Sequence, residues 1–438
     1  MDDVTALYRE LDPLRPLGGE EDGLYVDWQR QLDPEGPDVK SRLVQAFRRN
    51  ATPERPITRL LTGHRGSGKT TELNRVRSRL AAGDHGPKVF SSMLFAQEWL
   101  DLEDVQPEDL VLQIVRQLVA DLREEGVSVG EERLKGFFSS LWARVRSAKL
   151  DTVEAGIDPL SFSFTLEDFP TARSEFRSIL RAQLPTVFDL VNTELLPAAR
   201  EHLAGQGYDD LLLVVDDLDK IPQKVLREAG LTNHENLFLD NSAALRAINC
   251  SLLLTIPIEL AYSPAQARLR DDYGASIHTV PLLSIIDRGG SPIAAGRNAL
   301  IEIMGRRAQR AFGAEDAHPA QCAARIFESD EVLRRVVALS GGHLRSLLVI
   351  ASELLDWVEE LPVGGGAVER YAARTASDLG RALFKADKDI LEQVAGDGQG
   401  IEDPRFFELL RNQYVFAYEA GADGHWYGIN PFLREIDW

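Results

Sequence analysis

The clearest chemical signature in this chain is GHRGSGKT, residues 63–70, which fits the pattern G-x-x-x-x-G-K-[ST] without a mismatch. A largely apolar run, residues 57–61, comes before it, and Leu73, Val76 and Leu80 follow it at helical spacing. A strand, a glycine loop and a helix in this order are the context in which the pattern binds a polyphosphate. The alternative interpretation is a glycine turn in front of an ordinary helix.

The residue types of this loop suit phosphate chemistry. Gly63, Gly66 and Gly68 allow positive φ angles, so several backbone N–H groups can point inward around a polyphosphate. A helix that starts near Lys69 adds its unpaired N–H groups and the positive end of its dipole. The Lys69 ammonium can reach the β- and γ-phosphates, and the Thr70 hydroxyl can ligate Mg²⁺. We therefore expect ATP and Mg²⁺ as cofactors, and the expected cofactor-binding residues are Gly63, His64, Arg65, Gly66, Ser67, Gly68, Lys69, Thr70 and Thr71.

A second signature is LLLVVDDLD, residues 211–219. Its apolar residues predict a buried strand, with Asp216 and Asp217 at the carboxyl end, where α/β sheets bind ligands. In P-loop enzymes the first acid holds Mg²⁺, usually through water, and the second can orient or deprotonate the attacking water. Asp216 is thus the expected metal residue and Asp217 the expected catalytic residue. The alternative is a strand that ends in an acidic turn.

Composition bounds the class of protein. The chain has 438 residues, with 49 basic against 69 acidic side chains and a net charge of −20. This charge disfavours wholesale coating of a nucleic acid, although it leaves room for a local basic face. Cys250 and Cys322 lie in apolar stretches and are expected to be reduced core residues. No apolar run approaches the ~18 residues of a membrane span, and the acidic start has no secretory h-region, so we expect a cytoplasmic protein.

The remaining chain divides at breaks rich in glycine and proline. Residues 1–56 form a predicted N-terminal arm, and further buried strands are expected over residues 88–95, 250–256 and 277–283. The interval from Lys69 to Asp216 is too long for one strand and one helix, which indicates an insertion at about residues 126–183. Its LSFSFTLE segment alternates like a strand or hairpin. The chain turns helical after residues 289–292, and residues 405–438 predict a helix, a strand, a turn, a strand and a last helix, a winged-helix pattern.

With these motifs in place, the chain resembles bacterial P-loop ATPases of the AAA+ and STAND group. The resemblance rests on GHRGSGKTTEL, LLVVDDLDKI, SGGHLR and YVFAYEAGADGHWYGINPFL, covers most of the chain and weakens over residues 126–183. It implies an α/β fold with a five-stranded parallel sheet. It also implies a P-loop ATPase core over residues 57–288, a helical lid over residues 289–365 and a winged-helix-like domain over residues 366–438.

The resemblance further assigns roles to single residues. Thr255 falls near the sensor-1 position, and Arg345 of SGGHLR falls where the lid carries sensor 2, a contact to the γ-phosphate. Arg268 or Arg270 could serve a neighbouring subunit as an arginine finger, with a surface ion pair as the alternative. Asp217 stands where many AAA+ motors have Glu, and no pore-loop signature is present. These departures favour a slow switch over a motor or a threading unfoldase.

The expected function is an ATP-binding, slowly hydrolysing switch that self-associates or signals to a separate effector, in defence or signalling. One alternative is an AAA+-type nucleic-acid loader or remodeller, and another is an ATP-dependent scaffold with little turnover. Residues 405–438 hold three arginines against five acids, so the tail itself is a poor DNA reader. Tyr25 could stack on a base or serve as a core aromatic. Better basic candidates are two clusters: Arg144, Arg146 and Lys149, and Arg75, Arg77 and Arg79.

Overall fold

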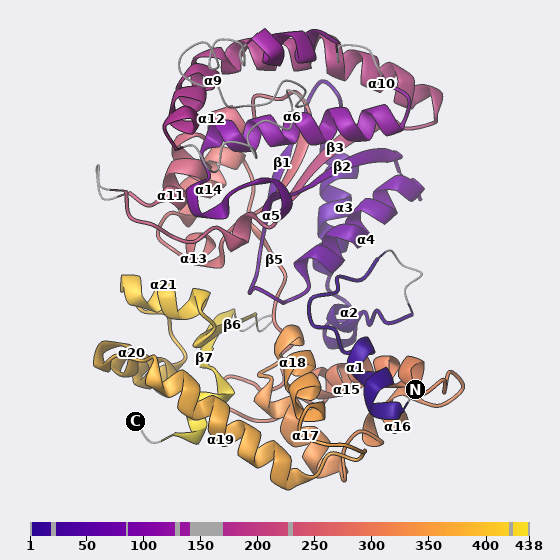
Figure 1. Ribbon diagram of the computed structural model, residues 1–438, viewed down its shortest axis with the longest axis vertical. Helices are drawn as coiled ribbons and strands as arrows, with labels where there is room; N and C mark the ends of the chain where they lie inside the picture. The colour runs from indigo at the N-terminus through magenta and orange to yellow at the C-terminus, as the bar shows by residue number, and fades with distance from the viewer. Residues whose placement is uncertain are drawn as a thin grey trace. The chain divides into compact units, whose positions relative to one another are not determined.

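The chain forms two compact units in the computed structural model, which describes residues 2–18, 23–84, 86–127, 132–140, 170–226, 231–419 and 424–436. One unit comprises residues 1–42, 63–75 and 279–438, and the other comprises residues 43–62 and 76–278 (Figure 1). We call the first the helix-rich unit and the second the sheet unit. Each has its own cluster of buried apolar side chains. The predicted strand or hairpin in LSFSFTLE lies outside the described residues, as does the cluster of Arg144, Arg146 and Lys149.

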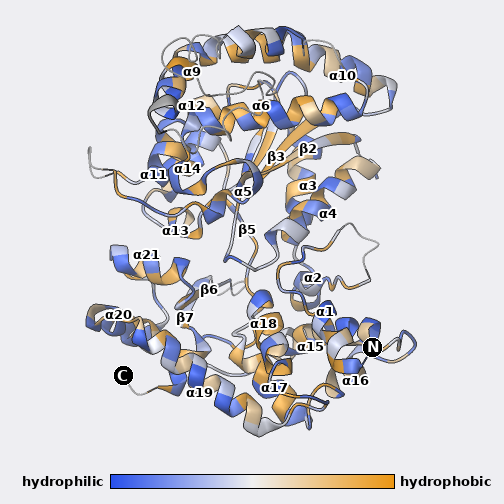
Figure 2. Ribbon diagram, viewed as in Figure 1, coloured by the Kyte–Doolittle hydropathy of each residue, from blue (hydrophilic) through white to orange (hydrophobic). Residues whose placement is uncertain are grey.

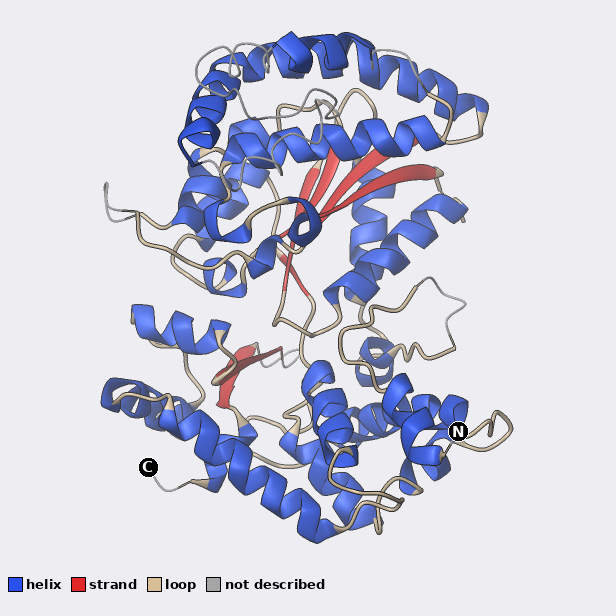
Figure 3. Cartoon of the chain, in the orientation of Figure 1, coloured by secondary structure: helices blue, strands red, loops and turns tan. Residues whose placement is uncertain are grey.

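A five-stranded sheet with the order β2-β3-β4-β1-β5 organises the sheet unit (Figure 3). Its bounds are β1 Thr58–Thr62, β2 Val89–Phe95, β3 Asp210–Asp216, β4 Ser251–Thr255 and β5 His278–Thr279. The pairs β1–β4, β2–β3 and β3–β4 are all parallel. The predicted five-stranded sheet is therefore confirmed. The strand expected over residues 277–283 is shorter, because only two of its residues pair.

Apolar runs explain why these segments become inner strands. All five residues of β4 are buried, as are six of the seven in β3, as expected for a sheet covered on both faces. The strands accordingly appear as hydrophobic ribbons in Figure 2. Helix α6 (Pro107–Glu124) packs on β2 and β3, and α10 (Leu196–Gly205) packs on β3. The other α-helices of this unit are α5 Ala96–Trp99, α9 Pro170–Leu190, α11 Asn233–Glu235, α12 Ser242–Leu245, α13 Ile258–Ala261 and α14 Gln266–Tyr273. It also contains the 3-10 helices η1 Leu102–Asp104 and η3 Leu218–Lys220 and the π-helices η2 Val191–Leu195 and η4 Asn236–Asp240.

The helix-rich unit takes in the N-terminal arm and the helices of the C-terminal part of the chain. The arm contributes α1 (Asp3–Glu10) and α2 (Trp28–Leu32), and both pack on α15 (Ala294–Ala311). The remaining helices are α16 Pro319–Ala324, α17 Asp330–Leu339, α18 Leu344–Leu355, α19 Gly365–Arg381, α20 Lys385–Asp397 and α21 Pro404–Arg411. The antiparallel strands β6 (Val415–Glu419) and β7 (His425–Ile429) follow, and the predicted last helix is the short 3-10 helix η6 (Pro431–Glu435).

Two helices belong to both units. Helix α3 covers Val39–Asn50 and α4 covers Lys69–Ala82. Both cysteines are buried and free, as predicted. Among the described helices, none combines the length and the apolar character that a membrane crossing requires.

Candidate nucleotide site

The glycine loop follows β1 directly and runs into α4, whose first residue is Lys69. Gly63, Gly66 and Gly68 have φ angles of 147°, 86° and 95°, in the region that side chains disfavour. A Cβ atom added to Gly66 would lie 2.6 Å from the Cβ of Arg345, and one added to Gly63 would lie 2.6 Å from the Val280 carbonyl oxygen. Backbone conformation therefore favours glycine at all three positions, and the lack of space requires it at Gly63 and Gly66 as well.

Lys69 is bound to the loop that precedes it. Its side chain is 6% exposed, and Nζ donates to the carbonyl oxygens of Gly63 and His64, each at 2.9 Å. A buried ammonium without partners would be costly, so these carbonyls hold the charge in place. Glycine backbone, a helix N-terminus and a lysine at the same loop form a donor set that fits a polyphosphate.

His64 packs against the C-terminal hairpin. Its imidazole is 2% exposed, and Nε2 accepts a hydrogen bond of 2.9 Å from the backbone N–H of Ala417 in β6. The ring also meets Phe416 edge-on at 5.6 Å. Burial, reinforced by His343 and Lys69 nearby, holds the pKa of His64 far below its usual range, so the ring is neutral. The His64 side chain is thus engaged by β6. The predicted contact of His64 to a nucleotide would therefore have to come from its main chain.

The SGGHLR motif reaches the same loop through His343. This residue caps α18, because Nδ1 accepts from the Ser346 N–H at 3.1 Å. Nε2 must then carry the proton, which it donates to the Arg65 carbonyl oxygen at 2.6 Å. The same carbonyl accepts from Nε2 of Gln413 at 2.7 Å. Burial lowers the pKa of His343 to about 4, so the capping tautomer persists at neutral pH.

Arg345, the predicted sensor, lies at the loop as well. Its backbone N–H donates to the Gly66 carbonyl oxygen at 3.3 Å, and its Nε donates to the Pro13 carbonyl oxygen at 3.3 Å. The structure therefore places Arg345 beside the glycine loop and the N-terminal arm. Its contact to a γ-phosphate stays a prediction.

The N-terminal arm binds the first turns of α4. The Thr71 hydroxyl accepts from the Leu17 N–H at 3.1 Å, so the side chain of this predicted nucleotide residue contacts the arm. The Tyr25 hydroxyl donates to Glu72 at 3.0 Å, and the Arg75 guanidinium packs on the face of the Tyr25 ring, 3.2 Å from its centre. Burial raises the pKa of Tyr25 and that of Glu72. The ring of Tyr25 is covered by an arginine, which argues against stacking on a base.

These contacts correct one interpretation of the basic residues on α4. Arg75 is 2% exposed beneath Tyr25, and Arg77 donates to the Ser91 hydroxyl at 3.0 Å and lies against the Met93 sulfur at 3.1 Å. Arg79 also has a partner in the structure. The three arginines therefore do not form the open basic face that a nucleic acid would need.

In the sheet unit, the end of β3 carries the predicted acids. Asp216 is 1% exposed, and its Oδ1 accepts from the Asp217 N–H at 2.7 Å. Asp217 has a left-handed backbone, with φ 68° and ψ 1°, and its Oδ1 lies 2.7 Å from Nζ of Lys220. Non-glycine residues in this region are uncommon and tend to mark functional sites. The backbone thus turns sharply between the two acids.

Thr255 fixes this turn from the neighbouring strand. Its side chain is fully buried at the end of β4. The hydroxyl accepts from the Leu218 N–H at 3.2 Å and donates to the Val215 carbonyl oxygen at 3.4 Å. The predicted sensor-1 residue therefore positions the residues on both sides of Asp216 and Asp217. Its action on a nucleotide remains a prediction.

The two arginine-finger candidates lie on α14. Arg268 pairs with Asp240 at 2.8 Å and with Asp272 at 3.6 Å, and its side chain is 51% exposed. The surface ion pair, the alternative interpretation, is thus what the structure shows for Arg268. Arg270 is exposed on the same helix.

Sequence reasoning missed the loop's contacts to the C-terminal segment, which Gln413, Phe416 and Ala417 provide. The hairpin itself was predictable from its alternating pattern. No local signal shows that its first strand pairs with a histidine 353 positions earlier. The polar Gln413 just before an apolar strand, with a φ of 63°, was the one local irregularity.

The parallel sheet, the glycine loop at the start of α4 and the acidic end of β3 define an α/β P-loop NTPase fold. No protein-family model matches the chain, and the comparison with curated proteins gives no match. Solved structures with similarity include the Drosophila ORC bound to DNA, at 13% identity and a TM-score of 0.42, covering 98% of this chain and 89% of that one. The Walker-type ATPase of Pyrococcus abyssi is similar at 17% identity and a TM-score of 0.41, covering 97% and 98%. The Aeropyrum pernix ORC1 protein in complex with DNA is similar at 14% identity and a TM-score of 0.36, covering 92% and 93%.

Proposed function

We propose that the chain is an AAA+-type ATPase that binds ATP, hydrolyses it slowly and acts as a nucleotide-dependent switch. One observation supports this most directly. The carbonyl of Arg65, in the phosphate loop, accepts from His343 of the lid and from Gln413 of the C-terminal segment. A loop that changes its hydrogen bonds on binding phosphate would change those of both elements.

The chain's own residues have distinct roles in this proposal. Lys69 leaves the carbonyls of Gly63 and His64 for the β- and γ-phosphates, where its charge has a stronger partner. Thr70 and Asp216 would hold Mg²⁺, which neutralises charge on the phosphates when bound. Asp217 orients the attacking water, and its short side chain in a left-handed turn suits slow hydrolysis. Arg345 contacts the γ-phosphate from the lid.

The output passes to another molecule. We assign the lid to residues 289–365 and the winged-helix-like domain to residues 366–438, as the two elements that respond to the loop. Self-association or a separate effector, in defence or signalling, would read their arrangement. A contact made with ATP and lost with ADP supplies the differential affinity that a switch requires.

Steady-state ATP turnover, with and without DNA, tests this proposal against its alternatives. A switch gives slow, Asp217-dependent turnover that DNA leaves unchanged. Turnover that DNA strongly stimulates would instead favour the loader, and binding without measurable turnover would favour the scaffold. The hypothesis of a nucleic-acid loader is weakened because Arg75 and Arg77 are engaged in contacts within the protein.

A further inference from the structure

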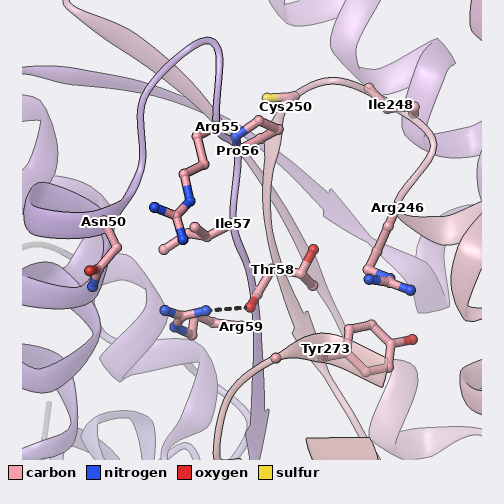
Figure 4. A pocket seen from close by; sticks show the side chains of 11 residues that line it. Asn50, Arg55, Pro56, Ile57, Thr58, Arg59, Arg246, Ile248, Cys250 and Tyr273 are labelled. Atoms are coloured by element: carbon pink, nitrogen blue, oxygen red, sulfur yellow. Dashed lines mark hydrogen bonds between the residues drawn. The ribbon is translucent and has the colours of Figure 1, made fainter. Parts of the chain in front are cut away.

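A pocket of about 470 Å³ lies in the sheet unit where β1 and β4 begin (Figure 4). The glycine loop follows the opposite, carboxyl end of β1, so this pocket is not part of the nucleotide site. Arg55, Arg59 and Arg246 line it, together with the ring of Tyr273. No carboxylate is among the described residues of its wall. In a chain with a net charge of −20, three arginines without an acid are a local reversal of charge.

Arg59 is the most informative of the three. It is the second residue of β1, between β4 and β5, where inner parallel strands are normally apolar on both faces. Its side chain is half-buried, and its guanidinium donates to the Thr58 carbonyl oxygen at 2.8 Å. Burial lowers the pKa of Arg59, which reflects the cost of holding this charge away from water. Within the described part of the chain, Arg59 forms no ion pair that would offset this cost.

The opposite wall is preformed. The Tyr273 hydroxyl donates to the Phe238 carbonyl oxygen at 2.8 Å, which fixes the ring at 5% exposure. The Arg246 guanidinium lies 5.5 Å from the centre of that ring, and its Nε donates to the Ser242 carbonyl oxygen at 3.3 Å. Arg246 is therefore held beside the pocket, and among the described residues its terminal nitrogens have no hydrogen-bond acceptor. Arg55, which is exposed, lines the same pocket.

We propose that this pocket binds the phosphate group of a phosphorylated ligand, independently of the nucleotide site. Guanidinium forks match phosphate oxygens bidentately, and three of them neutralise a dianion without help from a metal. The volume lies within the range of small-molecule sites and suits a ligand of up to nucleotide size. The phosphate could belong to a free small molecule or to a nucleic-acid strand, and the recognition chemistry is the same.

Calorimetric titration of the full-length Lys69→Ala variant, whose glycine loop is disabled, tests the proposal. The probes are inorganic pyrophosphate, AMP and a single-stranded oligonucleotide. At least one probe should bind, and Arg59→Gln and Arg246→Ala should each weaken it roughly tenfold or more, as charge-assisted bonds require. Arg49→Ala, which removes an exposed charge of α3 outside the wall, is the matched control and should leave binding within about twofold.

The probes distinguish the two sources. Binding of pyrophosphate or AMP without the oligonucleotide assigns a free phosphorylated molecule, and preference for the oligonucleotide assigns a strand. Arg246→Ala removes one of the like charges that line the pocket. Without ligand, its melting temperature should therefore stay level or rise. The proposal is overturned if none of the probes binds, or if Arg49→Ala weakens binding as much as the pocket variants do. A lowered melting temperature in Arg246→Ala together with unchanged binding would assign the arginine a structural role instead.

Discussion

The Nε2 atom of His64 and the backbone N–H of Ala417 are joined by a 2.9 Å hydrogen bond across 353 positions of sequence. His64 is the second residue of the glycine loop, and Ala417 is the middle residue of β6. Both groups are buried, so neither can exchange its partner for water without opening the contact. This hydrogen bond, between two residues of the same unit, therefore couples the conformation of the glycine loop to the position of the C-terminal hairpin.

Removing the acceptor of this bond should be costly. His64→Ala leaves the Ala417 N–H buried without a partner, and we expect a loss of about 1–3 kcal/mol in the free energy of unfolding. His64→Gln, whose side-chain carbonyl can accept, should recover part of it. Denaturation by urea measures both variants, with exposed His425→Ala as the control. Equal stability of the alanine and glutamine variants would show that packing of the ring, and not the hydrogen bond, matters at this position.

The neutral state of His343 predicts a pH dependence. Burial lowers its folded-state pKa to about 4, below the unfolded value near 6.5, so the unfolded chain binds more protons between these values. The contribution of neutral His343 to the free energy of unfolding is therefore fully present above about pH 6.5. It is lost as pH falls toward about 4, by up to about 3 kcal/mol. His64, with its pKa shifted in the same direction, adds to the loss.

The measurement is the free energy of unfolding at several pH values, for wild type and for His343→Asn. Asparagine can still cap α18 but does not titrate. The variant should lose less stability than wild type between pH 6.5 and 4. Parallel pH curves for the two proteins would mean that His343 does not contribute.

Nucleotide binding should depend on Lys69. Saturating Mg·ATP should raise the melting temperature of wild type, since a ligand at about 100 times its Kd adds about 2.7 kcal/mol. Lys69→Ala should abolish the shift because it removes the charge that the loop holds ready. Lys385→Ala is the matched control, as Lys385 is also the first residue of a helix and is exposed. A shift that survives in Lys69→Ala would refute the assignment of the loop.

Asp217 should act on turnover more than on binding. Asn tolerates the left-handed backbone that this position requires, so Asp217→Asn should keep the turn intact. We expect ATP affinity within a few fold of wild type and turnover lower by about 10²-fold, the range of general-base contributions. Asp219→Asn serves as the control. If that variant loses turnover and Asp217→Asn does not, Asp219 is the catalytic acid.

Much of the fold was predictable because its signals are local. The apolar runs that became β3 and β4 and the glycines before Lys69 each act within ten residues of chain. Thr255 could be singled out only by resemblance; the structure shows its hydroxyl bonded to Leu218 and Val215, and its sensor role stays a prediction. The burial of Arg75 under Tyr25 could not be foreseen, because a cluster of arginines on a helix has the same pattern whether it faces solvent or another segment. Long-range pairing of this kind depends on tertiary packing, which periodicity does not encode.

Hydrogen exchange over residues 340–358, compared in saturating ATP and saturating ADP, tests the switch most directly. Arg345 lies within this segment and its backbone N–H contacts the glycine loop, and a charge-assisted contact of its side chain to the γ-phosphate would exist only with ATP. We predict stronger protection with ATP than with ADP in wild type, and loss of that difference in Arg345→Ala with both nucleotides still bound. Identical exchange of the segment in ATP and ADP would contradict the switch and favour the scaffold.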